Sequence, residues 1–244
     1  MEPHEDSEHL VNGATYHYPD SQGHLRLRKI RFQRTPPPTD DIPFPAEQKS
    51  FYMQARKGEG MAWVQPKTLK RKYPAARAYF DSLLYRLPDL LAAVEGSEHG
   101  TLYITEGEKD ADSIAALGLP GVVAVSHWQG GARQGSGGPT SRQARRLRPW
   151  RGGVVVCADA DDAGAVTAFR WYGLLTRFGI PSERITVVRA AGPMPLDRGR
   201  DVTDHLKDGY TLDDLVPMDL HKLEKFALRV MASNPHPDGS GSPI

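Results

Sequence analysis

Residues 154–164 decide the fold, and they read Val154-Val155-Val156-Cys157-Ala158-Asp159-Ala160-Asp161-Asp162-Ala163-Gly164. The apolar run at the start of this stretch is typical of a buried strand. The residues from Ala163 to Phe178 are apolar at helical spacing and end at Gly179, so they predict a helix. Asp159 and Asp161 follow the strand at positions i and i+2, which places both carboxylates on one side if the extended backbone continues.

The same arrangement occurs about fifty residues earlier in the chain. The short apolar run 102–104 predicts a strand, and it is followed by the motif Thr105-Glu106-Gly107-Glu108-Lys109-Asp110 and a helix over 110–117. Further strands are expected at 122–125 and 185–188. Strands alternating with helices predict an α/β fold, a parallel sheet of about four strands flanked by helices. Such sheets bind ligands at the carboxyl ends of their strands, where both acidic motifs lie.

The first hundred residues have a different pattern. The segment 14–32 alternates apolar and polar residues around a turn at 19–23, which predicts a β-hairpin. A Pro-rich connector follows at 35–43. We therefore expect a smaller basic α+β subdomain over 1–98, an α/β domain over 99–216, a helix over 217–232 and a disordered tail over 233–244.

Composition excludes several classes of protein. Lys and Arg total 31 against 30 Asp and Glu, so partners are indicated by where the charges lie and not by the net charge of +1. Cys157 is the single cysteine, which excludes a disulfide within the chain and a Cys-rich zinc site. The start of the chain lacks the features of a signal peptide, and no apolar stretch approaches membrane-spanning length. These features predict a soluble, cytoplasmic protein without a membrane partner.

The carboxylates in the two motifs are candidates for metal binding and proton transfer. Glu106 directly follows a strand and precedes a glycine that permits close approach of a ligand. Asp159 and Asp161 suit Mg²⁺ or Mn²⁺, which prefer carboxylate oxygens. Capping of the following helix is the alternative role for Asp161 and for Asp162, and capping is equally open for Asp110.

These motifs resemble those of the Toprim family, which includes primases, topoisomerases and some nucleases. The resemblance covers residues 100–215, and the form Asp159-Ala160-Asp161-Asp162-Ala163-Gly164 is most similar to that of primases and phage primase-helicases. A third segment, Arg200-Asp201-Val202-Thr203-Asp204, resembles the Lys-Asp-x-x-Asp element of primases, with Arg in place of Lys. The resemblance implies that Glu106 is the general acid/base or a metal-side carboxylate and that Asp159 and Asp161 are the main metal ligands. Asp110 and Asp201 would support a further metal position, and helix capping is the alternative for Asp201.

Clusters of cations accompany the acidic motifs and could hold a nucleic acid or a nucleotide. A solvated charged surface is the alternative for each of them. The candidates are Arg28, Lys29, Arg31, Lys67, Lys70, Lys109, Arg142, Arg145 and Arg146.

Three functional hypotheses follow from the resemblance. The first is a primase-like nucleotidyltransferase that uses Mg²⁺ or Mn²⁺, single-stranded DNA template and NTPs in phage or plasmid replication, acting inside the bacterial host with a separate helicase. The second is a metal-dependent Toprim nuclease acting on DNA or RNA, because the same carboxylates would serve bond formation and cleavage. The third is a non-catalytic nucleic-acid-binding module.

Overall fold

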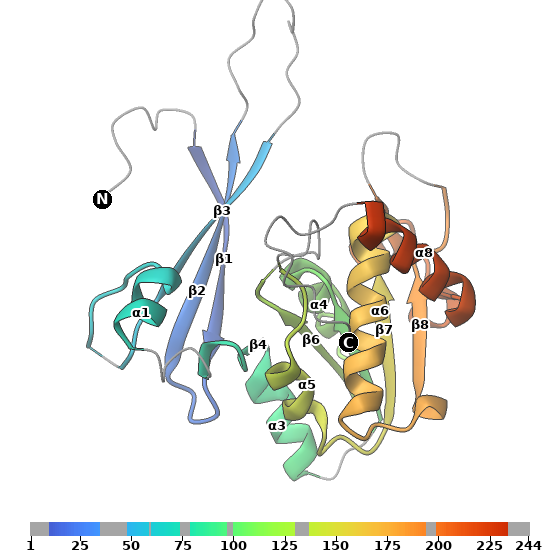
Figure 1. Cartoon of the computed structure of the whole chain (residues 1–244), viewed down its shortest axis with the longest axis horizontal. Helices are drawn as coiled ribbons and strands as arrows, with labels where there is room; N and C mark the ends of the chain where they lie inside the picture. The colour runs from blue at the N-terminus through green and yellow to red at the C-terminus, as the bar shows by residue number, and fades with distance from the viewer. Residues whose placement is uncertain are drawn as a thin grey trace, which may run out of the picture. The chain divides into compact units, whose positions relative to one another are not determined.

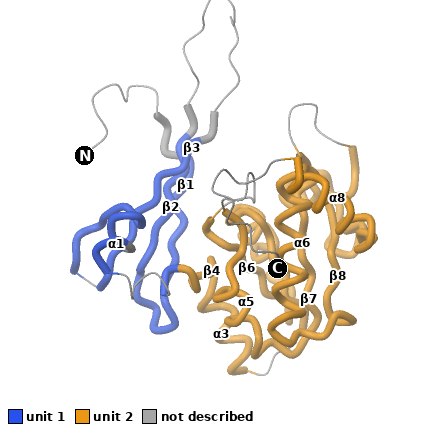
Figure 2. The backbone as a smooth tube through the Cα atoms, in the orientation of Figure 1, with its two compact units in different colours: residues 1–80 blue, residues 81–244 orange. Residues whose placement is uncertain are grey.

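The structure is a computed structural model that describes residues 10–34, 48–58, 60–73, 79–96, 100–129, 137–193 and 199–233. The chain forms two compact units, Met1–Phe80 and Asp81–Ile244 (Figure 2). The predicted connector over 35–43 lies outside the described residues, and so does the predicted tail from residue 234 onward.

The first unit is built on a three-stranded antiparallel sheet. Its strands are β1 (Leu10–Pro19), β2 (Leu25–Arg34) and β3 (Gln48–Ala55), in the order β1-β2-β3. The predicted hairpin is confirmed. Helix α1 (Pro66–Lys72), which begins at a proline, follows the sheet in the chain. The sheet register places Thr15 opposite Ile30, and Ile30 opposite Tyr52.

Asp20 fixes the turn between β1 and β2. Its carboxylate accepts hydrogen bonds from the backbone N–H groups of Gln22 (2.8 Å) and His24 (2.9 Å) and from Nε of Arg26 (2.8 Å). Burial opposes ionisation of this carboxyl, but the hydrogen bonds from Arg26 and the two N–H groups outweigh it and lower the pKa of Asp20 to about 2. The turn is thus held by a charged acceptor.

The second unit contains a six-stranded sheet in the order β4-β6-β5-β7-β8-β9 (Figure 1). The four inner strands are parallel: β5 (Thr101–Thr105), β6 (Val122–His127), β7 (Gly153–Ala158) and β8 (Ile185–Arg189). They confirm the predicted α/β fold. Two short antiparallel edge strands, β4 (Leu84–Tyr85) and β9 (Val216–Pro217), extend the sheet and were not predicted, because two residues carry no periodic signal.

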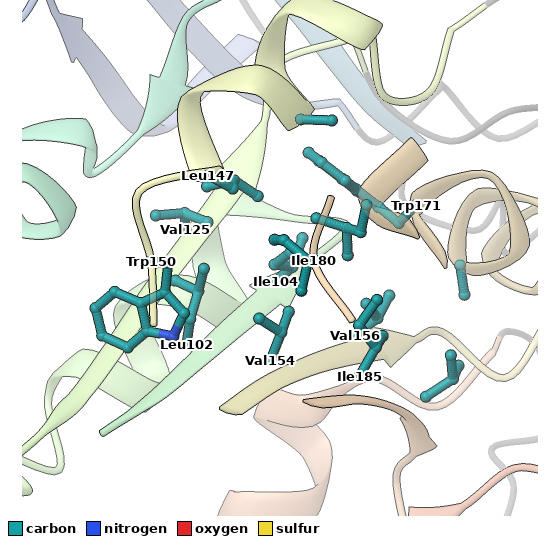
Figure 3. Packing of buried hydrophobic residues seen from close by; sticks show 14 of the residues in the cluster. Leu102, Ile104, Val125, Leu147, Trp150, Val154, Val156, Trp171, Ile180 and Ile185 are labelled. Atoms are coloured by element: carbon teal, nitrogen blue, oxygen red, sulfur yellow. The ribbon is translucent and has the colours of Figure 1, made fainter. Parts of the chain in front are cut away.

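Helices cover both faces of this sheet. They are α3 (Leu87–Glu95), α4 (Glu108–Ala115), α5 (Ser141–Leu147), α6 (Asp162–Arg177), α7 (Val202–Lys207) and α8 (Leu220–Ser233), with short 3₁₀ turns at Ser182–Arg184 and Leu212–Asp214. One core packs α3, α5 and α6 against residues such as Leu102 and Ile104 (Figure 3). A second core packs α4 and α7 against Tyr103 and Cys157. Alternate residues of each strand therefore face opposite layers, as the two-residue period of a strand requires.

The second unit starts earlier than the predicted boundary at 98/99. Residues 81–96 belong to it because β4 pairs with β6, and because Leu84, Leu87 and Leu90 lie in the same core as Ile104. Burying a leucine side chain stabilises a fold by about 1.5 to 3 kcal/mol, so these three side chains tie the segment firmly to the sheet.

Within the described residues, no helix is both long and apolar enough to cross a membrane.

Candidate active site

Acidic side chains gather at the carboxyl ends of the inner strands. Glu106 follows β5 and Asp159 follows β7, and these two strands are paired neighbours. Burial raises the pKa of Asp159 well above its usual value, and the charges of Glu106, Asp110, Asp201 and Asp161 raise it further. All five carboxylates that the sequence predicts as site residues are therefore electrostatically coupled at one edge of the sheet.

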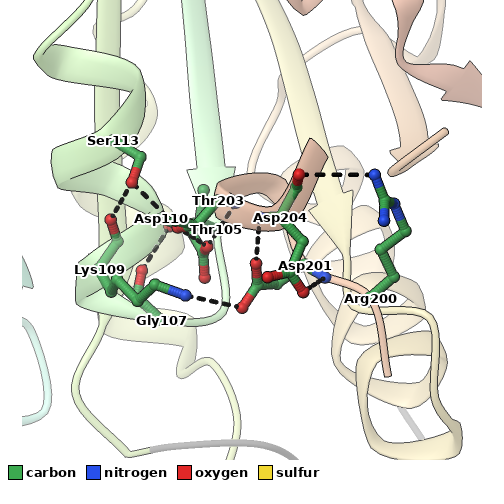
Figure 4. A network of polar contacts seen from close by, with 9 residues as sticks. All are labelled: Thr105, Gly107, Lys109, Asp110, Ser113, Arg200, Asp201, Thr203 and Asp204. Atoms are coloured by element: carbon green, nitrogen blue, oxygen red, sulfur yellow. Dashed lines mark hydrogen bonds and ion pairs between the residues drawn. The ribbon is translucent and has the colours of Figure 1, made fainter. Parts of the chain in front are cut away.

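Asp110 connects α4 to α7. Its Oδ1 accepts hydrogen bonds from the backbone N–H of Thr203 (3.0 Å) and from the Thr203 hydroxyl (2.5 Å) (Figure 4). Helix α4 begins at Glu108 after Gly107, so Asp110 lies inside the first turn and is not the N-cap that we considered. Burial raises the pKa of Asp110 to about 6, with a further contribution from the charge of Asp201 and an opposing one from the Thr203 hydrogen bonds.

Asp201 caps helix α7 and forms an ion pair with α4. It is the N-cap of α7, where its Oδ1 accepts from the backbone N–H of Asp204 at 2.8 Å. Its Oδ2 lies 3.2 Å from Nζ of Lys109. The capping role is thus confirmed. Lys109, which we expected to contact nucleic acid or a nucleotide, lies within the acidic cluster and neutralises part of its charge.

The loop 159–162 is held by backbone contacts. Asp161 is the N-cap of α6 and accepts from the backbone N–H of Gly164 at 2.7 Å, while Asp162 is the first helical residue. The N–H of Ala160 donates to the carbonyl of Arg200 at 3.0 Å, which joins this loop to the segment carrying Asp201. A Cβ on Gly164 would collide with the carbonyl oxygen of Asp159, so this position admits no side chain without moving the loop.

Two buried side chains that sequence reasoning missed hold the segment before α7. Arg200 is 3% exposed and donates to the carbonyls of Ala191 (2.5 Å) and Pro193 (3.2 Å). His205 is fully buried, and its Nδ1 accepts from the N–H of Ala191 at 3.0 Å, so its Nε2 donates to the Thr211 carbonyl at 2.6 Å. The sequence gives no signal for either role, because the hydrogen-bond partners of both side chains come close to them only when the chain folds.

The donor set of the cluster suits a hard divalent cation, because every candidate ligand is a carboxylate oxygen. A bound divalent cation would also offset the repulsion that raises the pKa of Asp159. Among the described residues, no three acid, histidine or cysteine side chains are arranged to hold an ion together. Asp161 and Asp201 each use one oxygen as a helix cap, and Asp110 uses one on Thr203.

The predicted cations of strand β2 lie on both faces of its sheet. Because side chains alternate along a strand, Arg26 and Arg28 project from one face and Lys29 and Arg31 from the other. Arg28 lies over the ring of Trp63 at 4.6 Å and donates to the Gln54 side chain at 2.6 Å. Lys29 is 6% exposed and lies 4.7 Å from the centre of the Phe51 ring.

The remaining predicted cations lie on two helices. Lys67 is exposed on α1, which also carries Lys70. Arg142, Arg145 and Arg146 lie on α5.

The structure does not place the α5 arginines at the acidic cluster. Arg145 lies 5.0 Å from the ring of Phe178, the C-cap of α6, whereas Asp161 caps the opposite end of that helix. A 16-residue helix is about 24 Å long, so Arg145 stands that far from the cluster. Arg146 contacts Ser82 at 3.4 Å.

Fold and site together define a class of protein, a mostly parallel α/β domain with helices on both faces of its sheet and a cluster of carboxylates at the carboxyl ends of its inner strands. No family model matches the sequence, and no curated protein matches it.

Solved structures that the chain resembles include primase catalytic cores. For the Escherichia coli primase catalytic core the identity is 16% and the TM-score 0.48, with 96% of this chain and 65% of that chain covered. For the DnaG primase catalytic domain bound to single-stranded DNA, the identity is 15% and the TM-score 0.47, with 96% of this chain and 64% of that chain covered. For a DNA primase domain from Pseudomonas aeruginosa, the identity is 14% and the TM-score 0.48, with 93% of this chain and 62% of that chain covered. The chain thus spans about two thirds of the length of these proteins.

Proposed function

We propose that the chain is a metal-dependent nucleotidyltransferase of the primase type, which joins nucleoside triphosphates into short primers on single-stranded DNA. The observation that carries this proposal is the gathering of acids at the carboxyl ends of the paired strands β5 and β7, where Glu106, Asp110, Asp161 and Asp201 lie close enough to Asp159 for their charges to raise its pKa. Such a concentration of carboxylates destabilises the fold unless it serves a cation, and hard divalent cations are the usual partners of phosphoryl transfer.

Each acid has a distinct part in this proposal. Asp159 and Asp161 would hold Mg²⁺ or Mn²⁺, with Asp110 and Asp201 beside a second ion. When bound, the ions would neutralise the negative charge on the α-phosphate that the hydroxyl attacks and on the pyrophosphate that leaves. Glu106 follows β5 directly and would accept the proton of the attacking hydroxyl. The ion pair with Lys109 would hold the carboxylate of Asp201 in place.

The test is a primer-synthesis assay with the full chain, single-stranded DNA, labelled NTPs and Mg²⁺ or Mn²⁺. The Asp159→Asn variant should produce no labelled oligonucleotide, and Glu106→Gln should lose activity by about 10² to 10⁴-fold. Glu183→Gln is the matched control, because this carboxylate is exposed and precedes strand β8 at the opposite end from the cluster. Cleavage of the DNA without synthesis would refute priming and favour the nuclease hypothesis.

A further inference from the structure

A pocket of about 610 Å³ opens beside the acidic cluster and is lined by three kinds of side chain. Asp159 and Asp161 line it from the loop before α6. Arg189, at the end of β8, and Lys222, in the first turn of α8, contribute cations. Its apolar lining includes Met218 and Phe226. A volume of this size accommodates a ligand of nucleotide dimensions.

Helix α8 presents a cation and an aromatic ring on the same face. Lys222 and Phe226 are four residues apart, so their side chains are neighbours on the helix surface. Phe226 is 38% exposed, so its ring is accessible to a ligand. Leu223, between them, is buried in the core and fixes the rotation of the helix.

The opposite wall of the pocket is also fixed. The N–H of Met218 donates to the carbonyl of Val187 at 2.8 Å, which holds the chain after β9 against β8. Arg189 is exposed two residues further along β8, and the described part of the chain contains no ion pair to it. A rigid frame therefore carries one accessible ring and two accessible cations next to two carboxylates.

We propose that this pocket binds a nucleoside triphosphate, with the base against Phe226 and Met218 and the phosphates toward Arg189 and Lys222. A flat heteroaromatic base suits an exposed ring, and phosphates suit Arg and Lys. Asp159 and Asp161 would repel a bare triphosphate, so binding would require a divalent cation held between the phosphates and these two carboxylates. This inference rests on the proposed function and assigns its substrate to a place on the chain.

The experiment measures binding of a fluorescent ATP analogue to the full chain by anisotropy, with Mg²⁺ and again with EDTA. Arg189→Met, Lys222→Met and Phe226→Ala should each weaken binding about tenfold, and EDTA should abolish it. Lys225→Met is the matched control, because Lys225 is an exposed lysine of the same helix outside the pocket lining, and it should bind as the wild type does. Circular dichroism and thermal melting confirm that each variant is folded.

Three outcomes separate this inference from the proposed function. Equal binding by all variants, together with primer synthesis that depends on Asp159, would overturn the pocket and leave the proposed function standing. Binding that persists in EDTA would likewise overturn the pocket as described. Absence of both nucleotide binding and primer synthesis in the wild type would overturn the two together.

Discussion

Asp110 stabilises the contact between two helices, yet its ionised form is electrostatically unfavourable. One of its oxygens joins α4 to α7 through two hydrogen bonds from Thr203, yet the group is 4% exposed and faces the charge of Asp201. Folding therefore raises its pKa from 3.8 to about 6. A carboxyl whose pKa rises on folding binds its proton more tightly in the folded state, so the fold loses stability as the pH rises through this interval.

A pH series on the metal-free protein tests this effect. Asp110→Asn keeps an acceptor for Thr203 but removes the charge, so its unfolding free energy relative to the wild type should increase as the pH rises from about 4 to about 7. A shift of about two pKa units corresponds to about 3 kcal/mol. Urea unfolding in EDTA measures the difference at each pH, and a constant difference across the series would contradict the prediction.

At the scale of elements, Gly164 sets the distance between the first turn of α6 and the loop that carries Asp159. A Cβ at this position would meet three backbone atoms of Asp159, none of which belongs to a flexible side chain. The carboxylate of Asp161 caps the same turn through the Gly164 N–H. Helix and loop are thus packed backbone against backbone, and the position of the Asp159 and Asp161 carboxylates depends on that contact.

Gly164→Ala should therefore displace the Asp159 loop. We expect a loss of about 1 to 3 kcal/mol in unfolding free energy and a loss of primer synthesis greater than this destabilisation explains. Gly153→Ala is the control, because a Cβ at Gly153 meets no atom within 4 Å. Chemical denaturation and the synthesis assay at a temperature where both variants are folded provide the comparison, and equal behaviour of the two variants would refute the argument.

The elements also show which parts of the structure are encoded locally. The runs that form β5 to β8 are long enough to carry a strand signal, so the parallel sheet was predictable, whereas β4 and β9 form only because the sheet edges offer partners. The start of α4 was predicted two residues late because its N-cap, Gly107, makes no side-chain capping bond.

In the site, local sequence identified the acids but not what holds them. Glu106, Asp159 and Asp161 are placed by the strands that precede them, so their gathering was predictable. Arg200 and His205 act on carbonyls and N–H groups that only the folded chain brings near. The same holds for Lys109, whose partner Asp201 lies 92 residues away in the sequence.

At the scale of the whole molecule, the boundary between the compact units falls at 80/81 and predicts which fragments fold. A fragment of residues 81–244 should unfold cooperatively on heating. A fragment of residues 99–244 lacks Leu84, Leu87 and Leu90, and so loses roughly 4 to 9 kcal/mol of burial, comparable with the whole stability of a domain. Differential scanning calorimetry distinguishes the two, and a cooperative transition in the shorter fragment would refute the assignment of residues 81–98.

Strand β7 carries the only cysteine of the chain two residues before Asp159. Cys157 is 4% exposed, and burial raises the pKa of its thiol, so alkylating reagents can reach a reactive thiolate only when the strand opens. The rate of alkylation therefore reports local opening of the strand that carries the acidic cluster. If a divalent cation binds these carboxylates as we propose, it should slow the alkylation of Cys157, so the thiol can report on binding without any engineered probe.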